Sequence, residues 1–415
     1  MKNYMRAYER LIRYAAYPTA SDENCPNCPS TPAQMEFAKA LAEEMKALGI
    51  EDANVDENGY VFGTIPANIP NWDGITIGFI AHMDVVDDVP FENIKPRVIE
   101  DYDGGEIVLN EALQIVMSPE NYPSLRNKVG KTLVVTDGTT LLGADDKAGI
   151  AEILTMAEVL RDHPSIRHGA IKIGFTPDEE IGRGADLFDV KRFGADFAYT
   201  SDGGSFGEVE YETFNAASLL VTVHGLSSHP GSAKGVMKNA SLIAMEYAML
   251  LPEAERPEKT EGYEGFFHLT GMRGEVELAT LNYILRDHDA AILERRKEDA
   301  RRAAQEINRR YGEGTIELKI CDSYRNMAEM VRPHWHLIET AYDAVREVGG
   351  TPTSVPVRGG TDGSRLSYMG LPCPNLSTGG YNGHGRMEYA CAEEMDDCVK
   401  VLIKIAEKYA AREKK

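Results

Sequence analysis

Strand-like and helix-like segments alternate along the first part of the chain, and this alternation restricts the fold more than any other feature. Strands are predicted at 60–65, 75–80, 170–175 and 197–200. Helices are predicted at 31–48 and 147–161, where apolar residues form a stripe on one face. Thr31 and Gln34 have the spacing of a capping box at the start of the first helix. Alternating strands and helices indicate an α/β protein with a mostly parallel sheet flanked by helices.

The order of elements changes near residue 215. The pattern there predicts a strand, a helix, two strands, a helix and a strand, at 216–224, 239–251, 266–272, 276–286, 289–311 and 315–320. The order β-α-β-β-α-β is that of a small α+β, ferredoxin-like domain. Alternation resumes near residue 326 and ends in a helix at 392–408. We therefore predict a discontinuous first domain (1–215 and 326–415) and an inserted second domain (216–325).

The composition narrows the classes of partner. A net charge of -22 argues against nucleic-acid and anionic-membrane partners, since both require basic patches. No window contains the roughly 18 apolar residues of a transmembrane helix, and residues 1–17 lack the apolar centre of a signal peptide. These features predict a cytoplasmic protein.

The acidic stretch Thr176–Glu180 follows the predicted strand at 170–175. Pro177 cannot donate a hydrogen bond to a neighbouring strand, so pairing should stop there. Neighbouring side chains of an extended segment point to opposite sides. One of Glu179 and Glu180 can then bind a metal ion while the other faces a water molecule. A solvated acidic turn is the alternative for this stretch alone.

Four further segments carry polar residues at predicted strand ends or before a helix. They contain His82 with Asp84, Asp145 before a helix, Asp202 before two glycines, and His384 among glycines. Each has a structural alternative: a surface pair, a helix N-cap, an Asp-Gly turn and a loop histidine. Asp84 lies two residues from His82 and can accept the proton of the ring nitrogen that does not face a metal.

Taken together, these segments predict a metal centre. We expect the metal ligands to follow strands of one sheet, whose carboxyl edge is where ligands bind in α/β proteins; they are His82, Asp145, Glu180, Asp202 and His384. Imidazole with carboxylate favours Zn²⁺, with Co²⁺ or Mn²⁺ as alternatives. Five ligands with one bridging aspartate make two metal sites. Glu179, adjacent to Glu180, is then the natural general base.

The chain resembles the M20 metallopeptidases over nearly its whole length. The segments that carry the resemblance are 82–84, 143–147, 178–180, 201–204 and 381–385, together with 231–239 and 358–374. The resemblance implies a zinc-exopeptidase-like catalytic domain and an inserted lid and dimerisation domain. It also implies that His82, Asp145 and Asp202 bind one zinc ion and that Asp145, Glu180 and His384 bind the other. A cis peptide bond between Asp145 and Asp146 is typical of the family.

The resemblance implies roles for two residues that no spacing argument indicates. His229 matches a lid-domain histidine that reaches into the partner subunit's site and stabilises the oxyanion. Arg358 matches an arginine that binds a substrate carboxylate, and a surface ion pair is its alternative. Gly383 stands where a bulkier residue is expected. Cys25 and Cys28 form a pair that the family lacks, and a lone CxxC in such a loop is more often incidental than metal-binding or redox-active.

The resemblance implies a di-zinc aminopeptidase that removes the N-terminal residue from short peptides, preferentially tripeptides, and that forms a homodimer through the lid domain. The same metal centre is compatible with a dipeptidase, a carboxypeptidase or an N-acyl amino acid deacylase. A metal-dependent binding protein without turnover is a further alternative, but such a protein has no need of a base such as Glu179. A phosphate-binding loop is not expected, because neither glycine-rich phosphate motif follows a strand.

Overall fold

The computed structural model describes residues 4–412, which form two compact units. The first unit comprises Met1–Tyr211, Glu329–Ser354 and Thr361–Lys415, and the second comprises Glu212–Ala328 and Val355–Gly360. The short segment Val355–Gly360, which contains Arg358, therefore belongs with the second unit, although the sequence pattern placed it in the first domain. The catalytic and lid roles of the two units stay predictions.

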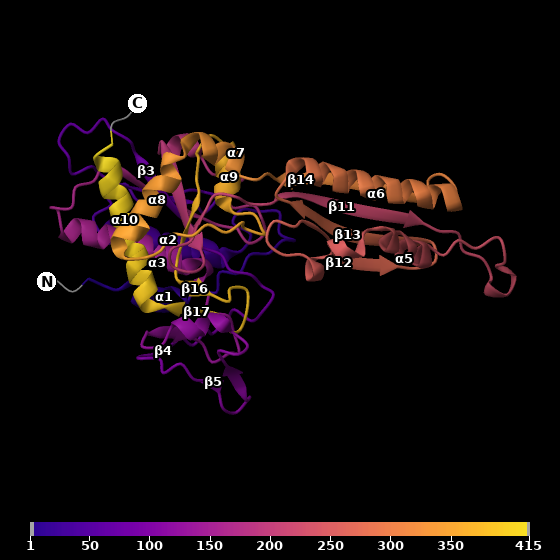
Figure 1. The fold of residues 1–415 in the computed structure, drawn as a ribbon, viewed down its shortest axis with the longest axis horizontal. Coiled ribbons are helices and arrows are strands. Elements are labelled where there is room, and N and C mark those ends of the chain that lie inside the picture. The colour runs from indigo at the N-terminus through magenta and orange to yellow at the C-terminus, as the bar shows by residue number, and fades with distance from the viewer. Residues whose placement is uncertain (1–3, 413–415) are drawn as a thin grey trace. The chain divides into compact units, whose positions relative to one another are not determined.

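The first unit is built on a seven-stranded sheet (Figure 1). In spatial order its strands are β1 (Asn54–Val55), β2 (Val61–Ile65), β8 (Ile171–Thr176), β3 (Ile77–His82), β9 (Phe197–Gly203), β15 (Asn375–Ser377) and β10 (Val209–Glu210). The four strands from β8 to β15 are parallel, and the outer pairs are antiparallel. Every residue of β3 is buried, as expected for a strand covered on both faces. The predicted α/β class and its mostly parallel sheet are confirmed.

Helices surround this sheet, and α3 packs directly against β3 and β9. The helices of this part of the chain are α1 (Ala7–Tyr14), α2 (Pro32–Ala47), α3 (Ala144–Asp162), α4 (Val190–Phe193), α7 (Ala328–Val331), α8 (His336–Val348), α9 (Asp362–Tyr368) and α10 (Ala392–Ala410), with the 3-10 turns η1 (Pro123–Asn127) and η5 (Arg332–His334). Helix α10 packs against α3 and α8. Helix α3 is counted from Ala144, but Asp145 and Asp146 have non-helical backbone angles, so its regular part begins at Lys147, where the sequence pattern predicted the helix.

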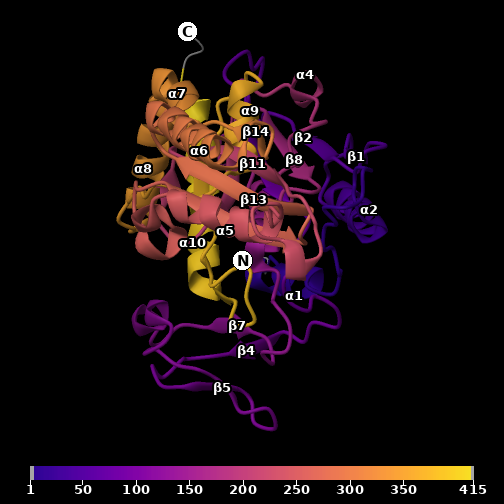
Figure 2. The same cartoon turned by 90° about the vertical axis from the view of Figure 1, so that its right-hand side faces the viewer.

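A group of short strands at 97–135 and 380–391 was not predicted from the sequence. The strands β4 (Arg97–Ile99), β7 (Leu133–Val135), β17 (Tyr389–Cys391) and β16 (Gly380–Tyr381) form a four-stranded sheet, and β5 (Ile107–Asn110) pairs with β6 (Ile115–Met117). Figure 2 shows β4, β5 and β7 together at one end of this unit. Strands of two or three residues are too short to show a period of alternation. This sheet holds the loop that carries His384.

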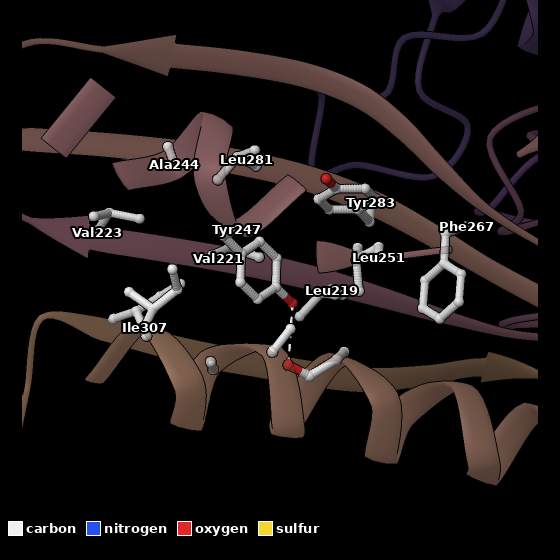
Figure 3. Close-up of a cluster of buried hydrophobic side chains, with 14 of the residues drawn as sticks. Leu219, Val221, Val223, Ala244, Tyr247, Leu251, Phe267, Leu281, Tyr283 and Ile307 are labelled. Atoms are coloured by element: carbon white, nitrogen blue, oxygen red, sulfur yellow. Dashed lines mark hydrogen bonds between the residues drawn. The ribbon is translucent and has the colours of Figure 1, made fainter. Parts of the chain in front are cut away.

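The second unit has the predicted order of elements. Its elements are β11 (Asn215–His224), η2 (Pro230–Ser232), α5 (Ala240–Leu250), η3 (Glu253–Glu255), η4 (Pro257–Lys259), β12 (Phe266–Gly274), β13 (Leu278–Asp287), α6 (Ala290–Tyr311) and β14 (Ile316–Tyr324). The sheet is antiparallel in the order β12-β13-β11-β14. Alternate residues of β11, including Leu219 and Val221, are buried in a core with Tyr247 and Leu281 (Figure 3). The Tyr247 hydroxyl donates to the carbonyl of Ala300 in α6 at 3.3 Å, which ties the two helices together.

Candidate metal centre and active site

The turn after β8 is held by a buried aspartate. Asp178 adopts a left-handed conformation (φ 57°). Its carboxylate accepts hydrogen bonds from the Ser30 amide at 2.8 Å and from Gln34 Nε2 at 2.8 Å. The Asp178 amide in turn donates to Gln34 Oε1 at 3.0 Å. These bonds fix the direction in which Glu179 and Glu180 leave the strand.

The same bonds correct the predicted capping box at the start of α2. Thr31 makes no side-chain cap, and its hydroxyl donates instead to the Ala20 carbonyl at 2.8 Å. Gln34 serves Asp178, which is distant in sequence, rather than the backbone of its own helix. A buried carboxylate without hydrogen-bond donors costs free energy. The bonds between Gln34 and Asp178 therefore form instead of a capping box between Gln34 and Thr31.

Asp84 joins the end of β3 to the acidic turn. His82 Nδ1 lies 3.1 Å from the Asp84 carbonyl oxygen and 3.4 Å from its Oδ1, so both oxygens face the ring nitrogen. The Asp84 carboxylate also accepts the amides of Glu179 and Glu180, at 2.9 and 3.0 Å. One buried side chain therefore orients the histidine and holds the two glutamates beside it.

The first group of candidate metal ligands consists of His82, Asp145 and Asp202. His82 Nε2 lies 3.0 Å from Asp145 Oδ1 and 3.4 Å from Asp202 Oδ1. One ligand atom from each of the three residues lies within 4.8 Å of the other two. One imidazole with two carboxylates is a donor set that suits zinc.

The second group consists of Asp145, Glu180 and His384. His384 Nε2 lies 3.3 Å from Asp145 Oδ2 and 3.1 Å from Glu180 Oε2. Asp145 thus turns one carboxylate oxygen toward each histidine, and the two groups share it. The structure brings all five sequence-predicted metal-ligand residues together.

The predicted origin of these residues from one sheet is wrong in part. Glu180 follows β8, and Asp202 lies in β9, both of the seven-stranded sheet. Asp145 begins α3, and the nearest strand before His384 is β16 of the smaller sheet. The peptide bond between Asp145 and Asp146 is cis, as expected.

The electrostatics of the site favour a cation. Burial, together with the charge of Asp145, raises the pKa of Glu180 to about 7. Burial also raises the pKa of Asp202. Among the described residues, Glu180 Oε1 is buried without a hydrogen-bond partner. Several carboxylates crowded in one buried place repel one another, and a multivalent cation removes that cost. The residues present therefore fit a metal centre.

Glu179 lies beside the two groups but belongs to neither. Burial raises the pKa of its carboxyl well above the usual value, and the negative charges of Asp202 and Asp362 add to the shift. Asp362, at the start of α9, is itself buried, and the sequence analysis did not single it out. A carboxyl whose pKa is moved toward neutrality is suited to taking up a proton during a reaction.

A cavity of about 210 Å³ opens beside the ligands within the first unit. Its lining includes Asp145, Asp202, Gly203, Gly204, Tyr381 and Gly383. A Cβ atom at position 383 would lie 3.1 Å from Asp145 Oδ2. Glycine at 383 therefore leaves the shared carboxylate of Asp145 uncrowded on this side, where the bulkier residue expected from the family would approach it.

His229 and Arg358 lie in the second unit. His229 is exposed, and its Nδ1 accepts the amide of Gly231 at 3.2 Å. The Arg358 guanidinium donates to the carbonyl oxygens of Gly262 and Glu264, each at 2.8 Å, and stacks over Phe214. These contacts, within residues 4–412, are not those of the surface ion pair considered as its alternative. Cys25 and Cys28 are free thiols and belong to neither ligand group.

Paired ligand groups that share a carboxylate, next to a half-buried carboxyl, are typical of hydrolases that use two metal ions. Residues 135–408 match the peptidase family M20/M25/M40, and the chain belongs to this family. It is 53% identical to a protein named Peptidase T from Alkaliphilus oremlandii over 99% of this chain and 100% of that one. The predicted resemblance to the M20 metallopeptidases, and with it a hydrolase of peptide bonds, is confirmed.

Two solved structures share the fold. One is an aminopeptidase PepT from Bacillus cereus, with a TM-score of 0.75, 23% identity and 98% of each chain covered. The other is a tripeptidase from Staphylococcus aureus, with a TM-score of 0.77, 21% identity and 98% of each chain covered. Among residues 4–412, no helix combines the length and the apolar character needed to cross a bilayer.

Proposed function

We propose that this peptidase is a two-metal aminopeptidase that removes the N-terminal residue from short peptides, with a preference for tripeptides. The observation that carries the proposal is the pair of ligand groups that share Asp145 beside the half-buried Glu179. The 53% identity to Peptidase T over nearly the whole chain supports the same function. Cytoplasmic location and the absence of nucleic-acid and membrane partners stay predictions from the sequence.

The metal ions are two Zn²⁺, with Co²⁺ or Mn²⁺ as alternatives. His82, Asp145 and Asp202 would hold one ion, and Asp145, Glu180 and His384 would hold the other. Zinc bound at such a site polarises the scissile carbonyl and lowers the pKa of water toward neutrality. The imidazole and carboxylate atoms of these residues match this ion better than Mg²⁺ or Ca²⁺, which prefer oxygen ligands alone.

Glu179 acts as the general base and then as the general acid. Its carboxylate accepts a proton from the attacking water and passes it to the leaving amine. Asp84 supports this step because it holds the Glu179 amide at 2.9 Å and orients the ring of His82. A base kept at a fixed distance from the ligands needs no rearrangement as charge develops.

The second unit supplies the lid and the recognition of the substrate's carboxyl end. Arg358 binds the substrate carboxylate through its planar guanidinium. Its present acceptors are carbonyl oxygens of the segment 260–264 and the Thr260 hydroxyl, so a substrate carboxylate at Nη1 or Nη2 competes with this segment for the guanidinium. His229 is exposed and able to reach another chain, where it stabilises the oxyanion of the partner subunit's site.

A homodimer through the second unit is supported by its exposed apolar surface. Leu242, Met245 and Met249 lie on one face of α5 and are 62%, 52% and 71% exposed. Strand β12 is an edge of the sheet and exposes Leu269 and Met272. An apolar helix face next to an unpaired strand edge is a surface that a second copy can cover.

Introducing charge on this face should separate the subunits. We expect the variant Leu242→Glu/Met249→Glu to be a monomer in sedimentation analysis and to lose most of its hydrolysis, because His229 then no longer reaches a partner's site. Leu113→Glu, at a 60% exposed position of the first unit, is the matched control and should remain dimeric. A dimeric double variant, or an unmodified chain that is fully active as a monomer, would refute this proposal.

The substrate preference is tested with matched small substrates. We expect Ala-Ala-Ala to be cleaved at its first bond faster than Ala-Ala, N-acetyl-Ala-Ala-Ala or N-acetyl-alanine. The C-terminal amide of Ala-Ala-Ala should show a raised KM, since it removes the charge that Arg358 binds. Preference for an N-acetylated substrate would favour a deacylase, and release of the last residue first would favour a carboxypeptidase. Either result would reject the aminopeptidase.

A further inference from the structure

We infer that Glu388 is a positioning residue for the metal centre, which it serves by fixing the backbone that carries Asp145. The inference rests on the proposed two-metal centre and adds a residue that makes no contact with metal or substrate in it. Glu388 is not a member of either ligand group, and the sequence analysis passed over it.

Three backbone amides converge on Glu388. Its Oε2 accepts the amides of Leu142 and Gly143, each at 2.7 Å, and its Oε1 accepts the amide of Asp145 at 3.0 Å. The residue is only 3% exposed. Both carboxylate oxygens are thus engaged with main-chain donors at the wall of the cavity that opens beside the ligands.

The backbone of residues 142–145 presents amides that need a hydrogen-bond acceptor such as this carboxylate. Gly143 is in the left-handed region (φ 76°), a conformation that turns successive amides toward one side and forms a concave site for an anion. Gly143 makes no side-chain cap, and Asp145 and Asp146 after it have non-helical backbone angles. The amides of this turn therefore lack the partners that a regular helix supplies, and such a group of amides attracts negative charge. Glu388, 245 residues further along the chain than Gly143, supplies that charge.

Glu388 also connects the two segments on which the second ligand group depends. It lies four residues after His384, in the segment between β16 and β17. Through its bonds to residues 142–145, the segment that carries His384 is tied to the turn that carries Asp145. Asp145 is shared by both groups, so a shift of its backbone disturbs both metal sites, and a shift of the Glu388 segment disturbs His384 as well.

A carboxylate is required at this position rather than any polar group. It has two acceptor oxygens and no donor, whereas a glutamine amide turns an NH₂ group toward one set of backbone amides. Glu388→Gln keeps the size of the side chain but leaves at least one amide facing a donor. Replacing a residue that orients a metal ligand through hydrogen bonds typically weakens metal binding by about 10–100-fold.

The test compares Glu388→Gln and Glu388→Asp with Glu393→Gln in the full-length protein. Glu393 is the matched control, because its Oε2 accepts the amide of Thr132 at 2.8 Å yet it contacts no candidate ligand. The measurements are Zn²⁺ affinity of the metal-free protein by competition with a chelating dye, the visible absorption spectrum with Co²⁺, and the melting temperature without metal. We expect Glu388→Gln to bind Zn²⁺ about 10–100-fold more weakly and to alter the Co²⁺ spectrum. Glu393→Gln should match the unmodified protein in both.

The outcomes separate a positioning role from a merely structural one. Wild-type affinity and an unchanged Co²⁺ spectrum in Glu388→Gln overturn the inference, even if its melting temperature falls. Equal weakening in Glu388→Gln and Glu393→Gln overturns it as well. If Glu388→Gln does not fold, Glu388→Asp is the deciding variant, because its shorter side chain cannot reach all three amides. Unchanged Zn²⁺ affinity in Glu388→Asp would then overturn the inference. An unmodified protein that binds no ion refutes the proposed function itself, whereas normal binding by the variants refutes this inference alone.

Discussion

Glu179→Gln should lower the rate of Ala-Ala-Ala hydrolysis by about 10²–10⁴-fold, the range that a positioned general base contributes. The variant keeps the size of the side chain and removes only its ability to accept a proton. Because Glu179 is not a member of either ligand group, the variant should still bind two metal ions. The measurements are kcat at saturating peptide and metal content per chain.

Glu180→Gln is the control that makes the result specific. Glu180 Oε2 lies 3.1 Å from His384 Nε2 in the second ligand group, so its variant should lose affinity for one ion as well as activity. Activity lost with both ions retained, in Glu179→Gln alone, identifies the base. Normal hydrolysis by Glu179→Gln would show that the proton goes to another group.

Asp145→Ala should abolish the binding of both metal ions and reduce kcat/KM by more than about 10³-fold, since metal ions contribute several kcal/mol to such reactions. The two oxygens of Asp145 lie 3.0 Å from His82 Nε2 and 3.3 Å from His384 Nε2. Removal of the shared carboxylate therefore takes one ligand from each group. Metal content after dialysis and the heat of metal binding are the measurements.

Single variants of the unshared ligands give the comparison. Asp202→Ala should weaken the ion beside His82, and His384→Ala should weaken the other ion. Asp137→Ala is the matched control, because Asp137 lies on the approach to α3 but accepts the Thr139 amide at 3.0 Å and is in neither group. Two ions bound with normal affinity by Asp145→Ala would contradict the sharing of this residue.

The main elements were predictable because each is a local pattern. The strand β8 and the helix α10 are long enough for their apolar residues to show a period. The chemical types of the metal ligands were also predictable, because few histidine and aspartate residues stand at the ends of predicted strands. Their assignment to one sheet failed for Asp145 and His384, because the second, smaller sheet has strands too short to recognise.

Other features could not be predicted because they join distant residues. Gln34 has the spacing of a capping residue but serves Asp178, which lies 144 residues away. Glu388 is an ordinary glutamate in sequence, and only the fold shows that three amides face it. No periodicity or spacing rule reports a hydrogen bond between segments so far apart.

The sequence by itself determined the α/β class, the inserted β-α-β-β-α-β segment and the chemical types of the metal ligands, because periodicity and residue chemistry are properties of short stretches. The tertiary structure alone decided that Asp145 faces both histidines, that Asp84 holds the two glutamates, and that Glu388 binds the turn before α3. These are distances between parts of the chain that meet only when the sheet and its helices pack. Such distances follow from the sum of many weak contacts across the whole fold, which no single stretch encodes.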